Sequence, residues 1–185
     1  MGSNPILLKL VSDTPPLQGL HRGGALELLR EAGAELTIPS AVDAQTRSSR
    51  EKAGGGKVPD LDAHRWIRVE PVSDQELAAA GAAPVGPRRS SFVYAWNGLK
   101  LDRPELEAVL VARRAGVPLL IEDETGVRCA RACGVPVTSV AAVLRDLSAA
   151  GRMDLAEAGR RARAILETGY FSRELEWLSR GIADF

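Results

Sequence analysis

The sequence has few of the residues that build disulfide scaffolds or histidine-based active sites. Two cysteines and two histidines occur in 185 residues. Cys129 and Cys133 belong to one expected helix, and no histidine stands nearby to complete a metal site. We therefore interpret both cysteines as reduced, partly buried apolar groups. His21 and His64 lack the paired nucleophile pattern of serine and cysteine hydrolases, so that class of enzyme is not expected.

The sequence also lacks a charge excess and a long hydrophobic run. Its 24 basic residues balance 24 acidic residues, so nucleic-acid binding would need a local basic patch. No apolar run reaches the roughly 18 to 20 residues that a membrane-spanning helix needs, and the first residues do not form a signal peptide. We expect a cytoplasmic protein with no membrane partner, in which residues 1–5 are disordered or a tag.

The apolar pattern alternates between short runs and helical stretches, which is typical of an α/β domain with a mostly parallel sheet. We expect a single domain over residues 1–185. Strands are expected at 6–12, 35–38, 66–72, 117–121 and 135–137. Helices are expected at 25–32, 40–46, 73–80, 104–115, 127–133, 139–150, 154–167 and 172–183, the last two in a C-terminal region of 152–185. Irregular loops are expected at 47–62 and 81–100.

Acidic residues follow two apolar runs of the same character, ILLKLVS and VPLLI. Asp13 comes after the first run and Asp123 after the second. Because the carboxyl ends of parallel strands meet at one edge of a sheet, both carboxylates are expected in the same crevice. Glu105 and Glu107 lie about 200° apart around the expected helix 104–115. We favour Glu107 at the crevice, because it shares its side with the apolar residues that should face the sheet.

Carboxylates crowded together would hold protons unless a cation joined them. Mg²⁺ takes hard oxygen ligands and is usually held by one or two carboxylates together with substrate phosphates. Such a group of acids would suit a Mg²⁺ or Mn²⁺ site that activates water against a phosphodiester. In the alternative interpretation, Asp13 and Asp123 cap the turn and the helix that follow them. The pattern alone leaves both interpretations open.

Three stretches resemble PIN domains of the bacterial and archaeal branch related to VapC-type toxins. Residues 10–42 read LVSDTPPLQGLHRGGALELLREAGAELTIPSAV, which is similar to the branch's strand, Ser-Asp-Thr-Ser-Pro-Leu, helix and Ile-Pro-x-x-Val. Residues 101–144 resemble its acids at a helix start, its strand ending in paired acids and its Thr-rich turn, and residues 169–178 resemble its closing helix. The resemblance implies a PIN-like three-layer fold with a central, mostly parallel sheet and helices on both faces.

The resemblance also implies a function and a site. PIN domains of this branch are metal-dependent endoribonucleases that hydrolyse RNA phosphodiesters, and many are the toxin of a toxin–antitoxin pair. By this resemblance Asp13, Glu107 and Asp123 occupy three of the usual four acidic positions and hold Mg²⁺ or Mn²⁺ and water. Glu105 and Glu122 are neighbours that would assist as metal ligands.

The sequence departs from the branch at the fourth acidic position. The branch usually has an acid there, and this chain has Gln45, which accepts a hydrogen bond but brings no charge. Pro15 also replaces a serine that follows Thr14. These differences predict one metal ion instead of two. They also keep open a weakened or inactive PIN-like module that binds RNA or a protein partner.

An RNA-cleaving domain without net charge needs basic residues around its acidic site, because phosphate contacts supply most of the affinity. Arg88 and Arg89 are candidates, and Arg47 and Arg50 belong to a second basic stretch. Three aromatic residues on which bases could stack follow the first pair: Phe92, Tyr94 and Trp96. The alternative, which we favour, is solvated loops with their aromatic side chains in the core. Trp177 stands on the last helix, whose apolar side either docks on the core or binds an antitoxin or a second copy of the chain.

Overall fold

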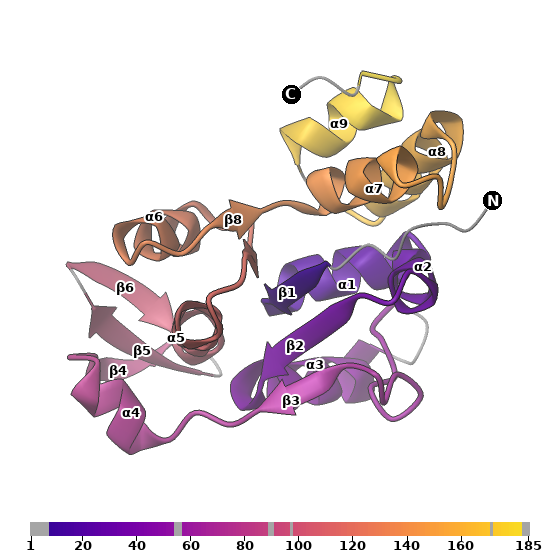
Figure 1. The fold of residues 1–185 in the computed structure, drawn as a ribbon. Coiled ribbons are helices and arrows are strands. Elements are labelled where there is room, and N and C mark those ends of the chain that lie inside the picture. Colours follow the sequence, from indigo (N-terminus) through magenta and orange to yellow (C-terminus); the bar gives the residue numbers. More distant parts are fainter. Residues whose placement is uncertain (1–7, 54–56, 89–90, 97, 171, 183–185) are drawn as a thin grey trace.

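A parallel sheet forms the centre of the molecule (Figure 1). The computed structural model describes residues 8–53, 57–88, 91–96, 98–170 and 172–182. Within them the sheet has the order β3-β2-β1-β7-β8, and each neighbouring pair is parallel. Its strands are β1 (Lys9–Ser12), β2 (Glu35–Pro39), β3 (Arg68–Glu70), β7 (Leu119–Leu120) and β8 (Val137–Thr138). The predicted α/β fold with a mostly parallel sheet is confirmed.

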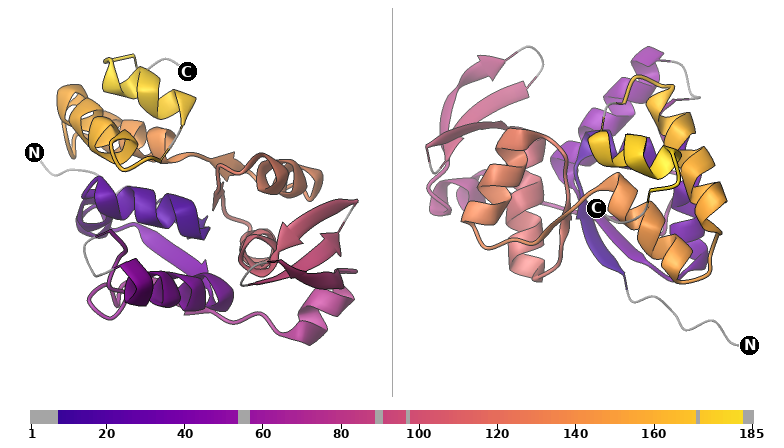
Figure 2. Two further views of the ribbon diagram at one scale, coloured as in Figure 1. Left: turned by 180° about the vertical axis from the view of Figure 1, so that it is seen from behind. Right: turned by 90° about the horizontal axis from the view of Figure 1, so that it is seen from above.

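Helices cover both faces of this sheet, as predicted. Because successive strand residues point to opposite faces, Leu10 and Leu120 belong to one hydrophobic core, whereas Val11 and Leu119 belong to another. The first core is completed by α1 (Thr14–Arg22), α2 (Ala25–Glu31), α7 (Val140–Ala149), α8 (Leu155–Leu166) and α9 (Arg173–Ser179). The second is completed by α5 (Arg103–Ala115) and α6 (Glu124–Ala132). The right-hand view of Figure 2 shows the strands between these two groups of helices.

A second, antiparallel sheet occupies most of the stretch that we expected to be an irregular loop at 81–100. It consists of β4 (Ala83–Arg88), β5 (Ser91–Trp96) and β6 (Leu99–Asp102), and it follows α4 (Asp74–Ala79). The loop prediction was wrong, although the stretch contains Pro84 and Pro87, which interrupt most strands. Both lie on β4, an edge strand, where proline is tolerated, and the ladder register shifts between Pro84 and Gly86.

The described aromatic residues of β5 are part of the core. Tyr94 and Trp96 are buried, and the Trp96 Nε1–H donates a hydrogen bond to the Ala80 carbonyl (2.8 Å). Neither ring is a surface on which bases could stack, so the core interpretation holds for these two residues. The side chain of Phe92 lies outside the described residues.

One helix was not predicted and another extends beyond its predicted limit. We predicted a turn after Asp13, but α1 begins at Thr14, because Pro15 and Pro16 occupy first-turn positions whose N–H groups have no helical partner. We expected α3 (Ser40–Ala53) to end near residue 46, but it continues through half of the predicted loop 47–62. Its C-terminal half is held by arginine contacts that are described below.

The C-terminal helices α8 and α9 lie where the sequence predicted them. Leu175 and Leu178 of α9 are buried in the first core, whereas Trp177 is 36% exposed. The cysteines also behave as predicted, since both are free and Cys129 is buried in the second core. In the parts of the chain that the structure describes, no helix has the length and apolar character of a membrane span.

Candidate active site

The register of β1 and β7 brings the ends of these two strands together. Ser12 pairs with Leu120 in parallel, and the Asp13 N–H donates a hydrogen bond to the Leu120 carbonyl (3.1 Å). Asp13 is the N-cap of α1, but its side chain makes no capping hydrogen bond. That side chain is 3% exposed. Asp13 therefore presents a buried carboxyl group at the edge where the strands end, and the interpretation of Asp13 as a side-chain cap does not hold.

Asp13 lies among other carboxylates. Burial above all, and then the charges of Glu105, Asp102 and Asp123, raise the pKa of Asp13 from 3.8 to about 8. We call these four residues the carboxylate cluster. At neutral pH a carboxyl group with this pKa holds its proton unless a cation lies beside it.

Local hydrogen bonds hold the other members of the carboxylate cluster in place. Asp102 and Glu105 form a capping box at the start of α5: the Glu105 N–H donates to Asp102 Oδ1 (3.0 Å), and the Asp102 N–H donates to Glu105 Oε2 (3.0 Å). Asp123 Oδ2 accepts the Gly126 N–H (2.9 Å) and caps α6, so its predicted capping role is confirmed. The sequence analysis missed Asp102, although Asp-x-x-Glu before an apolar helix is a recognised start signal.

Glu107 is held by contacts with Arg103 and with the start of α3. Its side chain is fully buried, and its Oε1 accepts a hydrogen bond from Arg103 Nε (2.7 Å). Its Oε2 accepts the Ala41 N–H (3.0 Å) and the Ser40 hydroxyl (3.3 Å) at the start of α3. The apolar side of α5 thus carries Glu107 into an ion pair against α3, whereas Glu105, in the first turn of α5, acts on the pKa of Asp13. Glu107 also lines the cavity that Gln45 lines, and its role as a metal ligand stays a prediction.

Gln45 faces the site, as its register predicted. Its Oε1 accepts a hydrogen bond from the Thr14 hydroxyl (2.5 Å), next to Asp13. Gln45 also lines a cavity of about 520 Å³ between α3 and α5, to which Arg103 and Glu107 contribute. The amide therefore stands near the carboxylate cluster without adding a negative charge.

Glu122 points to another helix. Its Oε1 accepts the Val140 N–H at the start of α7 (2.8 Å), and burial raises the pKa of Glu122. Its neighbour Asp123, in contrast, acts on the pKa of Asp13. Of the paired acids after β7, the structure therefore brings Asp123 and not Glu122 into the carboxylate cluster.

A comparison with protein families identifies the family of the chain. Residues 9–168 match the family DUF3368, described as a PIN domain. The chain belongs to the PIN domain family. Among solved structures it is similar to a PilT N-terminus domain protein, SSO1118, from the hyperthermophilic archaeon Sulfolobus solfataricus P2, with 19% sequence identity and a TM-score of 0.46 over 80% of this chain and 95% of that chain. A comparison with curated proteins finds no match. PIN domains are generally nucleases and usually use divalent metals.

The carboxylates of this PIN domain suit a divalent ion that takes only one or two ligands from the protein. Among the described residues, no group of three or more His, Cys, Asp and Glu side chains is arranged to hold a metal ion. Mg²⁺ needs only one or two carboxylates, because it keeps several waters and takes phosphate oxygens from its substrate. Asp13 and Glu105 fit such a site, since a cation beside them would offset both the burial of the Asp13 carboxylate and the charge of Glu105, which together raise the pKa of Asp13.

Two of the predicted RNA-binding arginines, Arg47 and Arg50, form ion pairs within the chain. Arg47 Nε lies 2.9 Å from Asp43 Oδ1, and its Nη1 lies 3.2 Å from Asp62 Oδ2. Arg50 Nη2 lies 3.1 Å from Asp60 Oδ2. These ion pairs fasten the segment after α3 to the helix, so much of the donor capacity of Arg47 and Arg50 is already used within the chain.

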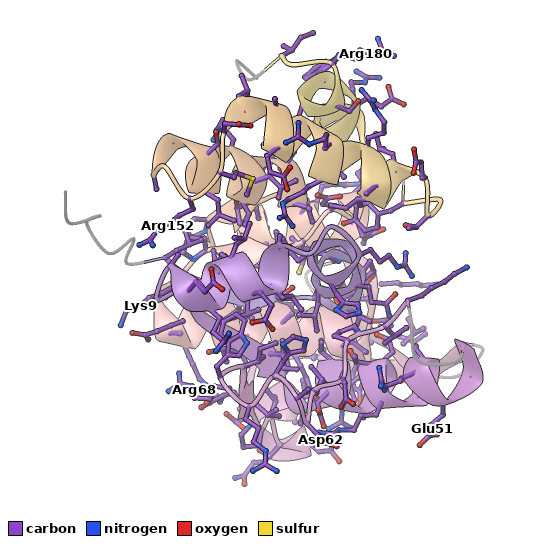
Figure 3. The ribbon with its side chains drawn as sticks, turned by 90° about the vertical axis from the view of Figure 1, so that its right-hand side faces the viewer. Lys9, Glu51, Asp62, Arg68, Arg152 and Arg180 are labelled. Atoms are coloured by element: carbon purple, nitrogen blue, oxygen red, sulfur yellow. The ribbon has the colours of Figure 1, made fainter. Side chains whose placement is uncertain are left out.

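The side chains of the other two predicted arginines lie outside the described part of the structure. Arg88 is the last residue of β4, and Arg89 lies outside the described residues. Elsewhere on the surface charges of both signs are mixed: Figure 3 shows a side of the molecule on which the basic Lys9 and Arg68 and the acidic Asp62 are all exposed. RNA binding by this PIN domain therefore requires a local site.

Proposed function

We propose that this PIN domain is a metal-dependent endoribonuclease that hydrolyses RNA phosphodiester bonds, with Mg²⁺ or Mn²⁺ as cofactor. The observation that carries the proposal is the buried carboxyl group of Asp13, whose pKa is raised by burial and then by the charges of Glu105, Asp102 and Asp123, where the ends of β1 and β7 meet. The family is generally nucleolytic. The resemblance to VapC-type toxins extends the proposal to a cytoplasmic toxin with an antitoxin protein as partner.

The chain's own residues give each carboxylate a separate task. Asp13 and Glu105 would hold the ion, which supplies an activated water and stabilises the charge on the leaving oxygen. Burial keeps the Asp13 carboxyl in one orientation and holds its proton when no cation is present. The capping box orients Glu105, and the contact with α6 orients Asp123 toward the same edge. Asp123 accepts a proton from the water that attacks the phosphodiester.

A weakened module that binds RNA or a protein partner is the second candidate, and particular contacts favour it. The Gln45 amide is hydrogen-bonded to Thr14 and has no charge, and Arg103 neutralises Glu107. The site therefore has fewer available negative charges than a four-acid site. If this candidate is correct, the protein binds RNA or its partner but does not turn over.

Cleavage of labelled single-stranded RNA with Mn²⁺ or Mg²⁺ separates the two candidates. The wild-type protein should produce fragments that do not form with EDTA, and an Asp13→Asn variant should not. Equal traces of cleavage from both proteins would identify a contaminating nuclease and remove the enzymatic proposal.

A Gln45→Glu variant is expected to bind Mn²⁺ more tightly than the wild type. The added carboxylate would lie beside Thr14 and Asp13, where a divalent ion gains a further charged oxygen ligand. Isothermal titration with Mn²⁺ measures the affinity, and Gln75→Glu on the exposed side of α4 is the matched control. Equal affinities in the wild type and Gln45→Glu would show that this face of α3 does not reach the ion.

A further inference from the structure

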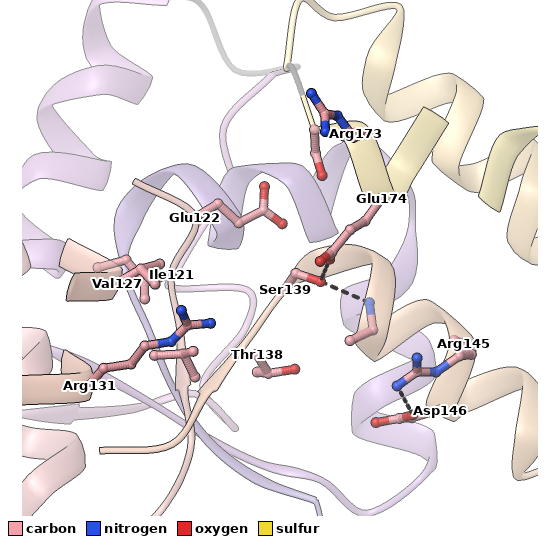
Figure 4. A pocket seen from close by; sticks show the side chains of 13 residues that line it. Ile121, Glu122, Val127, Arg131, Thr138, Ser139, Arg145, Asp146, Arg173 and Glu174 are labelled. Carbon is pink, nitrogen blue, oxygen red and sulfur yellow. Dashed lines mark hydrogen bonds and ion pairs between the residues drawn. The ribbon is translucent and has the colours of Figure 1, made fainter. Parts of the chain in front are cut away.

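A cavity of about 600 Å³ opens at the carboxyl ends of β7 and β8 (Figure 4). Its walls come from α6, α7 and α9, and its apolar lining includes Ile121, Val127 and Val137. The volume lies within the range of about 300 to 1,000 Å³ that is usual for small-molecule sites. The cavity is therefore large enough for a nucleotide-sized group.

Acidic side chains line this cavity, and other groups of the protein already bind them. Glu122 accepts the first backbone N–H of α7 (2.8 Å). Glu174 accepts a short hydrogen bond from the Ser139 hydroxyl, and Asp146 lies 3.5 Å from Arg145. Figure 4 shows the last two contacts at one side of the cavity. These carboxylates are therefore occupied by donors of the protein itself.

Arg131 and Arg173 differ from those acids. Both side chains are exposed at the cavity, and within the described part of the chain neither makes a hydrogen bond or an ion pair. Figure 4 shows Arg131 reaching toward the cavity from α6, and Arg173 at the start of α9 on another part of the rim. A guanidinium has five donors in a planar arrangement that matches phosphate oxygens. Two such groups at one cavity suit the phosphates on either side of a nucleotide.

The cavity is adjacent to the carboxylate cluster. Glu122 lines the cavity, and the next residue, Asp123, belongs to the cluster. A nucleic-acid strand with a phosphate at Asp13 would continue over this neighbouring surface.

We propose that the cavity binds a nucleotide of single-stranded RNA next to the bond that is cleaved, with Arg131 and Arg173 on its flanking phosphates. This inference rests on the proposed function and adds a binding subsite to it. An acidic segment of a protein partner would also suit unpaired guanidinium groups. The position beside the carboxylate cluster favours nucleic acid.

The test is the binding of a fluorescein-labelled single-stranded RNA, measured by anisotropy over a range of salt concentrations. Asp13→Asn serves as the background, with EDTA present, so that the RNA stays intact. Arg131→Gln with Arg173→Gln should weaken binding by roughly tenfold for each lost contact, as expected for hydrogen bonds to charged groups. The slope of log K against log salt should become shallower by about 0.7 per phosphate contact, or about 1.4 for both.

The matched control removes the same charge elsewhere. Arg113→Gln with Arg180→Gln changes two exposed arginines that do not line the cavity, and Arg180 lies at the end of α9 in Figure 3. This control should keep nearly all of the affinity. If both double variants lost the same affinity for RNA, the loss would come from the removal of positive charge in general, and the subsite would be wrong.

Two further measurements separate this inference from the proposed function. If the wild type cleaves RNA but Arg131→Gln with Arg173→Gln leaves binding unchanged, the subsite is wrong and the nuclease proposal stands. If the wild type never cleaves but binding depends on these arginines, the subsite stands and the nuclease proposal falls. If polyglutamate displaces the RNA at a comparable charge concentration through the same arginines, the cavity is a site for an acidic protein segment, and the subsite is again wrong.

Discussion

Replacing Asp13 with asparagine is expected to abolish cleavage and, without metal, to raise the melting temperature by roughly 10 °C at pH 7. The carboxyl group has a pKa of about 8 in the folded protein, against an ordinary value of 3.8 for the unfolded chain. Between these values the unfolded chain releases a proton that the folded protein keeps, so the free energy of unfolding falls as pH rises from about 4 to 8. At about 1.4 kcal/mol per pH unit, the cost at pH 7 is about 4 kcal/mol. For a chain of this length each kcal/mol corresponds to about 2 to 4 °C.

Thermal unfolding followed by circular dichroism at several pH values tests this result. The wild-type melting temperature should fall between pH 5 and pH 8, and that of Asp13→Asn should be flatter over this range. Mn²⁺ should stabilise the wild type and have little effect on the variant, because a ligand stabilises only the state that binds it. The exposed Asp74→Asn is the control, with an expected change under about 1 kcal/mol. Equal melting temperatures for the wild type and Asp13→Asn at pH 7 would contradict the raised pKa of the buried Asp13 carboxyl group.

Replacing Glu107 with glutamine is expected to lower the free energy of unfolding by about 3 kcal/mol. The substitution removes the buried carboxylate 2.7 Å from Arg103, which keeps only the exposed Asp74 at 2.9 Å, and it weakens the acceptor for the Ala41 N–H. Removing one member of a buried ion pair costs about 3 to 5 kcal/mol, and the lower end applies because the glutamine oxygen still accepts hydrogen bonds. Urea denaturation measures this loss.

Glu105→Gln is the matched variant on the same helix. Glutamine preserves a capping box, so its stability should stay within about 0.5 kcal/mol of the wild type. Its Mn²⁺ affinity and cleavage rate should fall, because the carboxylate beside Asp13 has lost its charge. If Glu107→Gln instead kept full stability and lost cleavage, while Glu105→Gln cleaved normally, Glu107 would be the catalytic acid, as the sequence analysis favoured.

Several features of the site follow from local sequence patterns. Apolar runs that end in Asp13 and Asp123 are enough to predict two parallel strands whose ends meet, because neighbouring parallel strands share one edge. The helical register that begins at Ser40 predicts that Gln45 faces this edge, and its hydrogen bond to Thr14 agrees. In each case the information lies within one strand or within two turns of a helix.

The second sheet shows where local patterns become insufficient. Pro84 and Gly86 are typical of a loop when only their neighbours are considered. They lie on a strand because β5 pairs with β4 on one side and leaves the other side unpaired. The burial of Trp96 likewise depends on its contact with Ala80, and a pattern of single residues does not specify such a partner.

The sequence by itself determined the parallel sheet, the family of the fold and the strand ends that carry Asp13 and Asp123. Only the tertiary structure decided what the two acids of α5 contact. Glu105 caps its own helix and acts on the pKa of Asp13, whereas the Glu107 carboxylate accepts the N–H of Ala41, 66 residues away in sequence. Periodicity determines which residues share a side of a helix, but the neighbouring elements determine what each side contacts.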